Sequence, residues 1–212
     1  MKFFDLENNS ISKKSFVEIY SSIYLYVNRD DELENTILEI LRNRQKDCPP
    51  ELTETDISNI LKWKTGSKIK DGCVNIRFGR KINIKNVYNA TQKADTTLPI
   101  DDNKARSLVD KFCTVENIGP VYAITLLYFL SGGKYPIYDV YARIAVEAID
   151  GEREIPLKKN RSNNSPSLSG FNDYNNNYRK KIVKEIFRGE DIRDRKFDRA
   201  LWAYGHLFYK EK

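Results

Sequence analysis

The chain has only one histidine, His206, among its 212 residues, and this scarcity restricts the chemistry that the protein can perform. A serine–histidine–aspartate triad would have to use that residue, and a metal site built from several histidines is excluded. The three cysteines, Cys48, Cys73 and Cys113, are scattered and form no Cys-x-x-Cys pair. A disulfide framework, a zinc ribbon and an iron–sulfur cluster each need a different pattern. We therefore expect chemistry based on carboxylates, lysines or tyrosines, with a structural role for His206.

Long hydrophobic runs are also lacking. No stretch approaches the roughly 18 consecutive apolar residues that a membrane span needs, and no apolar segment follows Met1-Lys2 as in a secretory signal. The composition, 40% hydrophobic and 31% charged, is typical of a globular protein rather than a disordered one. We expect a soluble, cytoplasmic protein without a membrane partner.

The net charge of +6 is unevenly distributed along the chain. Residues 57–93 carry nine basic side chains against Asp71 alone, and residues 153–188 carry nine against three acidic ones. The segment between them is apolar and nearly neutral. Two basic flanks around such a centre suit a cleft that binds phosphates at its rims. Two solvated faces without any partner would explain the same distribution.

Apolar residues recur at helical spacing over most of the chain. These stripes predict helices near 16–27, 33–41, 53–63, 86–94, 101–113, 120–131, 139–149, 178–188 and 194–210. Thr53 and Asp56 form the pattern of a capping box. Between residues 74 and 84 the spacing changes to alternation around Gly79-Arg80, which predicts a short β-hairpin. The expected fold class is therefore all-α, or mainly helical, with one short hairpin.

Four segments describe the expected organisation. Residues 1–52 would form helices that pack on a core of residues 53–150, and residues 178–212 would complete the fold. Residues 151–177 hold seven of the chain's 19 asparagines, together with Ser, Gly and Pro, and indicate a long mobile polar loop.

A tight turn, Asn117-Ile118-Gly119-Pro120, joins two predicted helices within residues 107–131. Gly119 can adopt a positive φ without penalty, and Asn117 tolerates one better than most residues. Pro120 suits the first position of the second helix, where its missing N–H costs nothing. Unpaired N–H groups at such a helix start can bind a phosphate. An ordinary pair of core helices would use the same residues.

Asp139 is expected at the start of the next helix, after Gly132, Gly133 and Pro136 have ended the apolar one. Its carboxylate could accept hydrogen bonds from the unpaired N–H groups of that helix, a structural role worth about 1 kcal/mol. The same ionised carboxylate could instead line a cleft and reach a substrate. The residues alone leave both readings open.

Together these segments resemble the helix-hairpin-helix Gly/Pro-Asp DNA glycosylases. The interval of 20 residues from Gly119 to Asp139 is similar to the hairpin-to-aspartate interval of that superfamily. A closer resemblance, to bacterial proteins with an 8-oxoguanine DNA glycosylase (OGG) fold, covers roughly residues 52–150 and 195–208. The segments that carry it are Trp63-Lys64-Thr65, Gly119–Ala123, Tyr135–Asp139 and Arg199–Gly205.

The resemblance implies a two-lobed helical fold and a DNA glycosylase that flips out a damaged or modified base and hydrolyses its N-glycosidic bond. Asp139 falls on the catalytic aspartate, which would stabilise the oxocarbenium-like sugar and activate water. Base excision repair, or defence against modified phage DNA, would be its role. The expected partner is double-stranded DNA, bound by a monomer. We expect no cofactor, apart from a monovalent cation that the hairpin could hold.

Departures from the superfamily pattern affect the expected mechanism. The first glycine of the usual Gly-x-Gly hairpin is Asn117 here, and the position of the Schiff-base lysine in bifunctional members is Val121. Valine cannot form an imine, so a monofunctional enzyme is expected. Lys64 is an alternative imine nucleophile for a glycosylase/lyase, and it could equally contact a phosphate or lie on the surface. A non-enzymatic helix-hairpin-helix DNA-binding protein is the further alternative.

The remaining candidate residues form two groups. Those expected to contact the DNA backbone are Asn117, Ile118, Gly119, Val121, Lys134, Arg143, Lys62 and Lys68. Those expected to stack on the flipped base, or to fill its place in the duplex, are Trp63, Tyr122, Tyr135, Tyr138 and Tyr141. Trp63 shares a helix face with Ile57 and Ile60, so a place in the core is its alternative.

Overall fold

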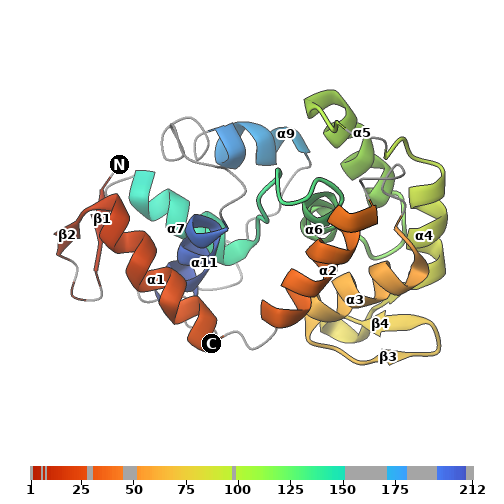
Figure 1. Ribbon diagram of the computed structural model, residues 1–212, viewed down its shortest axis with the longest axis horizontal. Coiled ribbons are helices and arrows are strands. Elements are labelled where there is room, and N and C mark those ends of the chain that lie inside the picture. The colour runs from red at the N-terminus through yellow and green to blue at the C-terminus, as the bar shows by residue number, and fades with distance from the viewer. Residues whose placement is uncertain are drawn as a thin grey trace. The chain divides into compact units, whose positions relative to one another are not determined.

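The computed structural model describes residues 2–5, 7, 9–27, 31–44, 52–96, 99–150, 171–180 and 195–208. Helices dominate these residues and the strands are short (Figure 1), so the predicted fold class, mainly helical with a short hairpin, is confirmed. The chain divides into two compact units. Unit 1 comprises the described residues within Met1–Arg29, Tyr138–Ser167 and Lys180–Lys212, and unit 2 those within Asp30–Ile137 and Leu168–Arg179.

Unit 1 contains the helices α1 (Lys13–Val27), α7 (Val140–Asp150) and α11 (Lys196–Phe208). α11 packs against both other helices. Phe16 and Tyr20 of α1 meet the ring of Tyr204 edge-on, with centroids 5.2 and 4.9 Å apart. A short antiparallel pair, β1 (Phe3–Phe4) and β2 (Ser10–Ile11), packs on this cluster through Phe3. The core of unit 1 is therefore largely aromatic.

α7 and α11 approach each other closely at Gly205. A Cβ atom on this residue would overlap the main-chain carbonyl of Tyr141 on α7. Glycine in a helix interior costs stability relative to alanine, so this position is explained by packing and not by helix propensity.

Unit 2 is organised around α6 (Pro120–Leu130), in which every residue from Ala123 to Leu130 is buried. A helix that is apolar on all sides is stable only when other elements surround it. The helices that pack on α6 are α2 (Asp31–Arg44), α3 (Glu54–Thr65) and α5 (Asp102–Cys113). α4 (Ile84–Gln92) packs in turn on α3 and α5.

Local signals in the sequence explain where α3 begins and ends. The Thr53 hydroxyl accepts from the N–H of Asp56, and the Asp56 carboxylate accepts from the N–H of Thr53 at 2.8 Å. The predicted capping box is therefore confirmed. Gly66 ends the helix in the left-handed conformation, with φ +65°.

A three-stranded antiparallel sheet follows α3, formed by β3 (Ile69–Lys70), β4 (Cys73–Asn75) and β5 (Lys81–Asn83). Val74 and Ile82 face each other across β4 and β5 and are fully buried. The hairpin predicted near 74–84 is thus confirmed, with β3 as an additional strand. The 3-10 turn η1 (Arg77–Gly79) closes it, and the Asn83 side chain caps the first turn of α4.

Two expectations about the organisation are corrected. The helices of residues 1–52 do not both pack on the core of residues 53–150, because the aromatic face of α1 packs on α11 in unit 1 whereas α2 packs on α3 and α6 in unit 2. Residues 171–177 are not a polar loop but lie in the helical segments α9 (Phe171–Asp173) and η2 (Tyr174–Arg179). Their aromatic rings, those of Phe171 and Tyr174, are buried.

Some expectations lie outside the described residues. These are Cys48, residues 151–170 of the predicted loop, and most of the helix predicted near 178–188. Within the part of the chain that the structure describes, we find no helix both long and apolar enough to cross a membrane.

Candidate functional site

The predicted turn between α5 and α6 is present, and the residue with positive φ is Asn117, at +64°. Gly119, which we expected to use its freedom of φ, is instead extended, with φ −91° and ψ 174°. The reason is local, because the residue before a proline avoids helical conformations and favours extended ones. Asn117 stands where the superfamily pattern has a glycine, and asparagine is one of the few other residues that adopt the left-handed conformation readily.

The first turn of α6 presents unpaired backbone N–H groups. The N–H groups of Tyr122 and Ala123 donate to the Gly119 carbonyl. Among the described residues, the N–H groups of Gly119 and Val121 have no acceptor. A Cβ atom placed on Gly119 would meet no atom within 4 Å, so this part of the surface is open. Open N–H groups at the positive end of a helix dipole suit an anion such as a phosphate.

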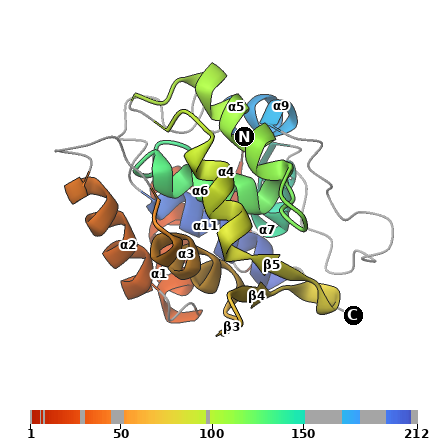
Figure 2. The same ribbon diagram turned by 90° about the vertical axis from the view of Figure 1, so that its right-hand side faces the viewer.

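The sheet is attached to this turn by Asn117. Its side-chain amide donates to the main-chain carbonyl of Lys81 in β5, at 2.8 Å. Tyr122, in the first turn of α6, is close enough to Arg77 and Arg80 for their charges to lower its pKa, although burial raises it more strongly and the net shift is upward. We use the name hairpin surface for residues of the β4–β5 hairpin and of the turn and start of α6, elements that are drawn in Figure 2: Arg77, Arg80, Lys81, Asn117, Gly119 and Val121.

A shallow groove of about 270 Å³ lies beside the turn, between α4 and the C-terminal end of α5. Side-chain amides and two lysines dominate its lining, and one acidic residue, Glu116, is also present. Amide and ammonium groups are suited to hydrogen bonds with phosphate or sugar oxygens. Sequence analysis missed this groove because two separate segments, α4 with the residue after it and the end of α5 with the turn after it, supply its lining: Asn86, Asn89, Ala90, Lys93, Lys111, Thr114, Val115 and Glu116.

Asp139 caps α7 in unit 1. One carboxylate oxygen accepts the N–H of Tyr141 at 3.0 Å and that of Ala142 at 3.1 Å. Its main-chain carbonyl accepts from the N–H of Arg143. The structural alternative for Asp139 is thus present in the molecule. A carboxylate held in this way is half-buried and fixed in orientation, which catalysis at this position would also require.

An aromatic cluster lies next to Asp139 along α7. Tyr141 meets Trp202 and His206 of α11 edge-on, with centroids 5.4 and 4.8 Å apart. The rings of Trp202 and His206 stack at 4.6 Å. His206 therefore has the packing role expected from its isolation in the sequence. Arg143, a candidate DNA contact on the same helix, forms an ion pair with Glu147 at 2.7 Å.

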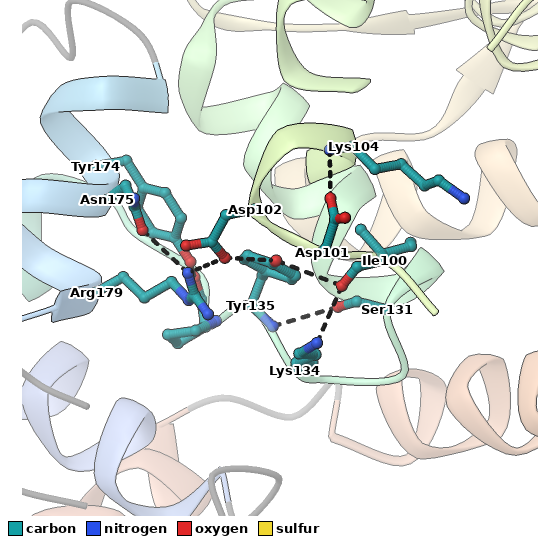
Figure 3. A network of polar contacts seen from close by, with 11 residues as sticks. Ile100, Asp101, Asp102, Lys104, Ser131, Lys134, Tyr135, Tyr174, Asn175 and Arg179 are labelled. Atoms are coloured by element: carbon teal, nitrogen blue, oxygen red, sulfur yellow. Dashed lines mark hydrogen bonds and ion pairs between the residues drawn. The ribbon is translucent and has the colours of Figure 1, made fainter. Parts of the chain in front are cut away.

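Two further candidates, Lys134 and Tyr135, belong to a polar network within unit 2 (Figure 3). The Tyr135 hydroxyl donates to the Asp102 carboxylate at 3.0 Å, and Arg179 both pairs with that carboxylate and lies over the Tyr135 ring. The Lys134 ammonium donates to the carbonyl of Ile100 at 3.0 Å. These contacts connect the segment after α6 to the start of α5 and to η2.

The network leaves Tyr135 unsuited to stacking on a base, because its ring is fully buried. Burial raises the pKa of its phenol, and the hydrogen bond to Asp102 acts in the same direction, whereas the charge of Arg179 opposes both. Lys134 is exposed, but its ammonium already has a protein acceptor.

The other candidates differ in how accessible they are. Trp63 is only 8% exposed and meets Phe129 edge-on at 5.4 Å, as expected for its core alternative. Tyr138 is buried, while Tyr122 and Tyr141 are half-buried. Lys64 is half-buried near the end of α3. Lys62 and Lys68 are exposed and Ile118 is buried under the turn.

Metal-binding groups and reactive thiols were sought in the same residues. Across the described ranges, no cluster of three or more His, Cys, Asp or Glu side chains could hold a metal ion. Cys73 and Cys113 are free thiols, and burial raises the pKa of Cys113.

Comparisons with family models, with curated proteins and with solved structures find no match to this chain. Function must therefore be inferred from the residues of the chain and from their geometry.

Proposed function

We propose that the protein is a DNA glycosylase that removes a damaged or modified base from double-stranded DNA. The observation that carries the proposal is the order of its elements: α5, a turn with Asn117 in the left-handed conformation, α6, and an aspartate that begins α7. This order, with an interval of 20 residues from Gly119 to Asp139, is the pattern on which the resemblance to the helix-hairpin-helix glycosylases rests.

DNA would bind first through its phosphates. The open N–H groups of Gly119 and Val121 would accept one phosphate, and Arg77, Arg80 and Lys81 supply positive charge on the same surface. These contacts would fix the position of the duplex without selecting its sequence.

Base removal would depend on Asp139. Cleavage of the N-glycosidic bond develops positive charge on the sugar, and a fixed, ionised carboxylate stabilises that charge. The same group could orient the water that attacks the sugar and accept its proton. Because Val121 occupies the position of the Schiff-base lysine, the enzyme is proposed to be monofunctional. It is also proposed to need no cofactor. It would act as a cytoplasmic monomer, on damaged cellular DNA or on modified phage DNA.

The proposal is tested by Asp139→Asn on duplexes that carry single base lesions or modifications, with abasic product scored as alkali-labile sites. Asparagine caps helices about as well as aspartate, so the fold should be preserved while the charge is removed. Asp101→Asn is the matched control, because Asp101 caps α5 through the N–H of Lys104 at 2.8 Å. We expect Asp139→Asn to bind DNA but release no base, and Asp101→Asn to retain activity. Base release by Asp139→Asn at the wild-type rate contradicts the proposal.

A DNA-binding protein without enzymatic activity is the second candidate. It is favoured by the cap that Asp139 provides for α7, which gives the residue a role that needs no substrate. This candidate predicts salt-sensitive DNA binding that Asp139→Asn does not change, and no abasic product from any substrate.

A glycosylase/lyase that uses Lys64 is distinguished by chemical trapping. A Schiff base between Lys64 and the abasic sugar would be reduced by borohydride to a stable protein–DNA adduct. Lys64→Ala should then lose the adduct. Lys62→Ala, two residues earlier in the last turn of the same helix, should keep it. The monofunctional proposal predicts that neither the wild-type protein nor either variant forms an adduct.

A further inference from the structure

Phe78, at the tip of the hairpin between β4 and β5, has a conformation that packing does not explain. Its side chain is 88% exposed, and its backbone is left-handed, with φ +65° and ψ 30°. A bulky residue pays a steric cost in this conformation, and an exposed ring gains little burial in return. Residues held in this way are found where the strain serves a function.

Asparagine would suit position 78 better than phenylalanine. Phe78 and Gly79 both have positive φ, at +65° and +70°. Asn-Gly is the favoured pair at two consecutive positive-φ positions of a hairpin, because asparagine tolerates the left-handed region. The hairpin therefore carries an apolar ring at the one place where its own stability favours a small polar residue.

The charged residues next to Phe78 in the hairpin are all basic. Arg77 and Arg80 flank it and are both exposed, and the Arg80 guanidinium lies 5.9 Å from the centroid of the ring. Lys81 follows directly. The one acidic residue of segment 57–93 is Asp71, which lies in the turn between β3 and β4. An exposed ring flanked by cations matches a polyanion with a stack of apolar faces.

The tip is held in place from below. The N–H of Ile76 donates to the carbonyl of Arg80 at 2.9 Å, which closes the hairpin. Val74 and Ile82 anchor its base in the core, and Asn117 joins β5 to the turn before α6. Phe78 is therefore presented on a supported element, the hairpin of β4 and β5 (Figure 2), whose strand β5 is bonded to the turn before α6.

We infer that Phe78 inserts between the stacked bases of bound duplex DNA while Arg77 and Arg80 contact the flanking phosphates. Apolar side chains wedged into a base step unstack it, and the space left by a flipped base needs such a filler. The inference rests on the proposed function for the identity of the ligand, and it adds Phe78, a residue that the motif resemblance does not contain.

The test uses the full chain and a duplex that carries 2-aminopurine, whose fluorescence rises when it is unstacked. Phe78→Asn removes the ring and relieves the backbone strain, so it should leave the unfolding midpoint unchanged or higher. Tyr26→Asn is the matched control, since Tyr26 is also an exposed aromatic residue, at 89%, and lies on α1 of unit 1. We expect Phe78→Asn to lose most of the fluorescence increase and to slow base release by roughly tenfold or more. Tyr26→Asn should behave as wild type.

The outcomes separate this inference from the glycosylase proposal. Unstacking by Phe78→Asn equal to that of wild type overturns the inference, and the glycosylase stands if base release continues. Unstacking that needs Phe78 but leads to no base release supports the inference and contradicts the glycosylase. Absence of any DNA binding by the wild-type chain overturns both. If circular dichroism shows that Phe78→Asn is not folded, Phe78→Gly, which also relieves the strain, takes its place in the test.

Discussion

The side-chain amide of Asn117 donates a hydrogen bond of 2.8 Å to the main-chain carbonyl of Lys81, 36 residues earlier in the chain. Asn117 thereby has two functions, because its left-handed backbone also forms the turn between α5 and α6. The bond joins the basic hairpin to the helix start with open N–H groups, and the two parts of the proposed DNA contact depend on it together.

Asn117→Asp should weaken both the fold and DNA binding. A carboxylate cannot donate to the Lys81 carbonyl, and its charge would repel a phosphate at the turn, so we expect a loss of about 1 kcal/mol in unfolding free energy and a weaker affinity for DNA. Urea titration and fluorescence anisotropy measure the two effects. Asn103→Asp, an exposed position in the first turn of α5, adds the same charge and should change neither strongly. Equal effects of the two substitutions would contradict the role of the turn.

Arg80→Gln should reduce the salt dependence of DNA binding. Each phosphate contact contributes about −0.9 to the slope of log affinity against log salt concentration, so loss of one contact should make that slope shallower by about one. The measurement is a salt titration of affinity at several sodium chloride concentrations. Lys14→Gln, an exposed position on α1, serves as the control and should leave the slope unchanged. An unchanged slope for Arg80→Gln removes this residue from the DNA contact.

Gly205→Ala should destabilise unit 1. Alanine is the better helix former by about 1 kcal/mol, and on an isolated helix the substitution would stabilise. Here the added methyl group would overlap the Tyr141 carbonyl, so α7 and α11 must separate at a cost of about 1–3 kcal/mol or more. Thermal or urea unfolding measures the sign of the change. An increase in stability would show that the two helices do not approach at this residue.

Asp139→Ala and Asp139→Asn should differ in stability although both lack the carboxylate charge. Alanine loses the bonds to the N–H groups of Tyr141 and Ala142, at a cost of about 1 kcal/mol, whereas asparagine keeps a capping oxygen. Urea titration of both variants tests this, with Asp101→Ala on α5 as a parallel case. If the alanine variant is as stable as the asparagine variant, the cap contributes nothing to the fold.

Tyr135 should make the protein sensitive to high pH. Burial raises the pKa of its phenol in the folded state well above the ordinary value of about 10, so its stabilising contribution is complete below about pH 10 and is lost as the pH rises further. Wild type should lose unfolding free energy as the pH rises above about 10, and Tyr135→Phe, which cannot ionise at this position, should lose less. Tyr26→Phe, at an exposed position, is expected to follow wild type. If the unfolding free energies of wild type and Tyr135→Phe fall in parallel as the pH rises, Tyr135 is not the source of the sensitivity.

The sequence by itself determined the features that depend on near neighbours. The helices α3, α5 and α6 were predictable because apolar spacing, the Thr53–Asp56 capping box and Pro120 act within a few residues. The order of the Asn117–Pro120 turn and Asp139 could be read from the sequence for the same reason. Which residue of the turn takes the positive φ also has a local cause, the extended preference of Gly119 before proline, although we had expected it at Gly119.

Only the tertiary structure decided which candidate side chains are accessible. Tyr135 is buried because Asp102 and Arg179, from distant parts of the chain, meet at its hydroxyl and ring. Phe78 is exposed although it continues the apolar alternation of Val74 and Ile76, because the hairpin turns away from the core at that residue. The division of residues 1–52 between two units likewise follows from the partners of α1 and α2. Burial and hydrogen-bond partners depend on segments far apart in the sequence, and local periodicity carries no information about them.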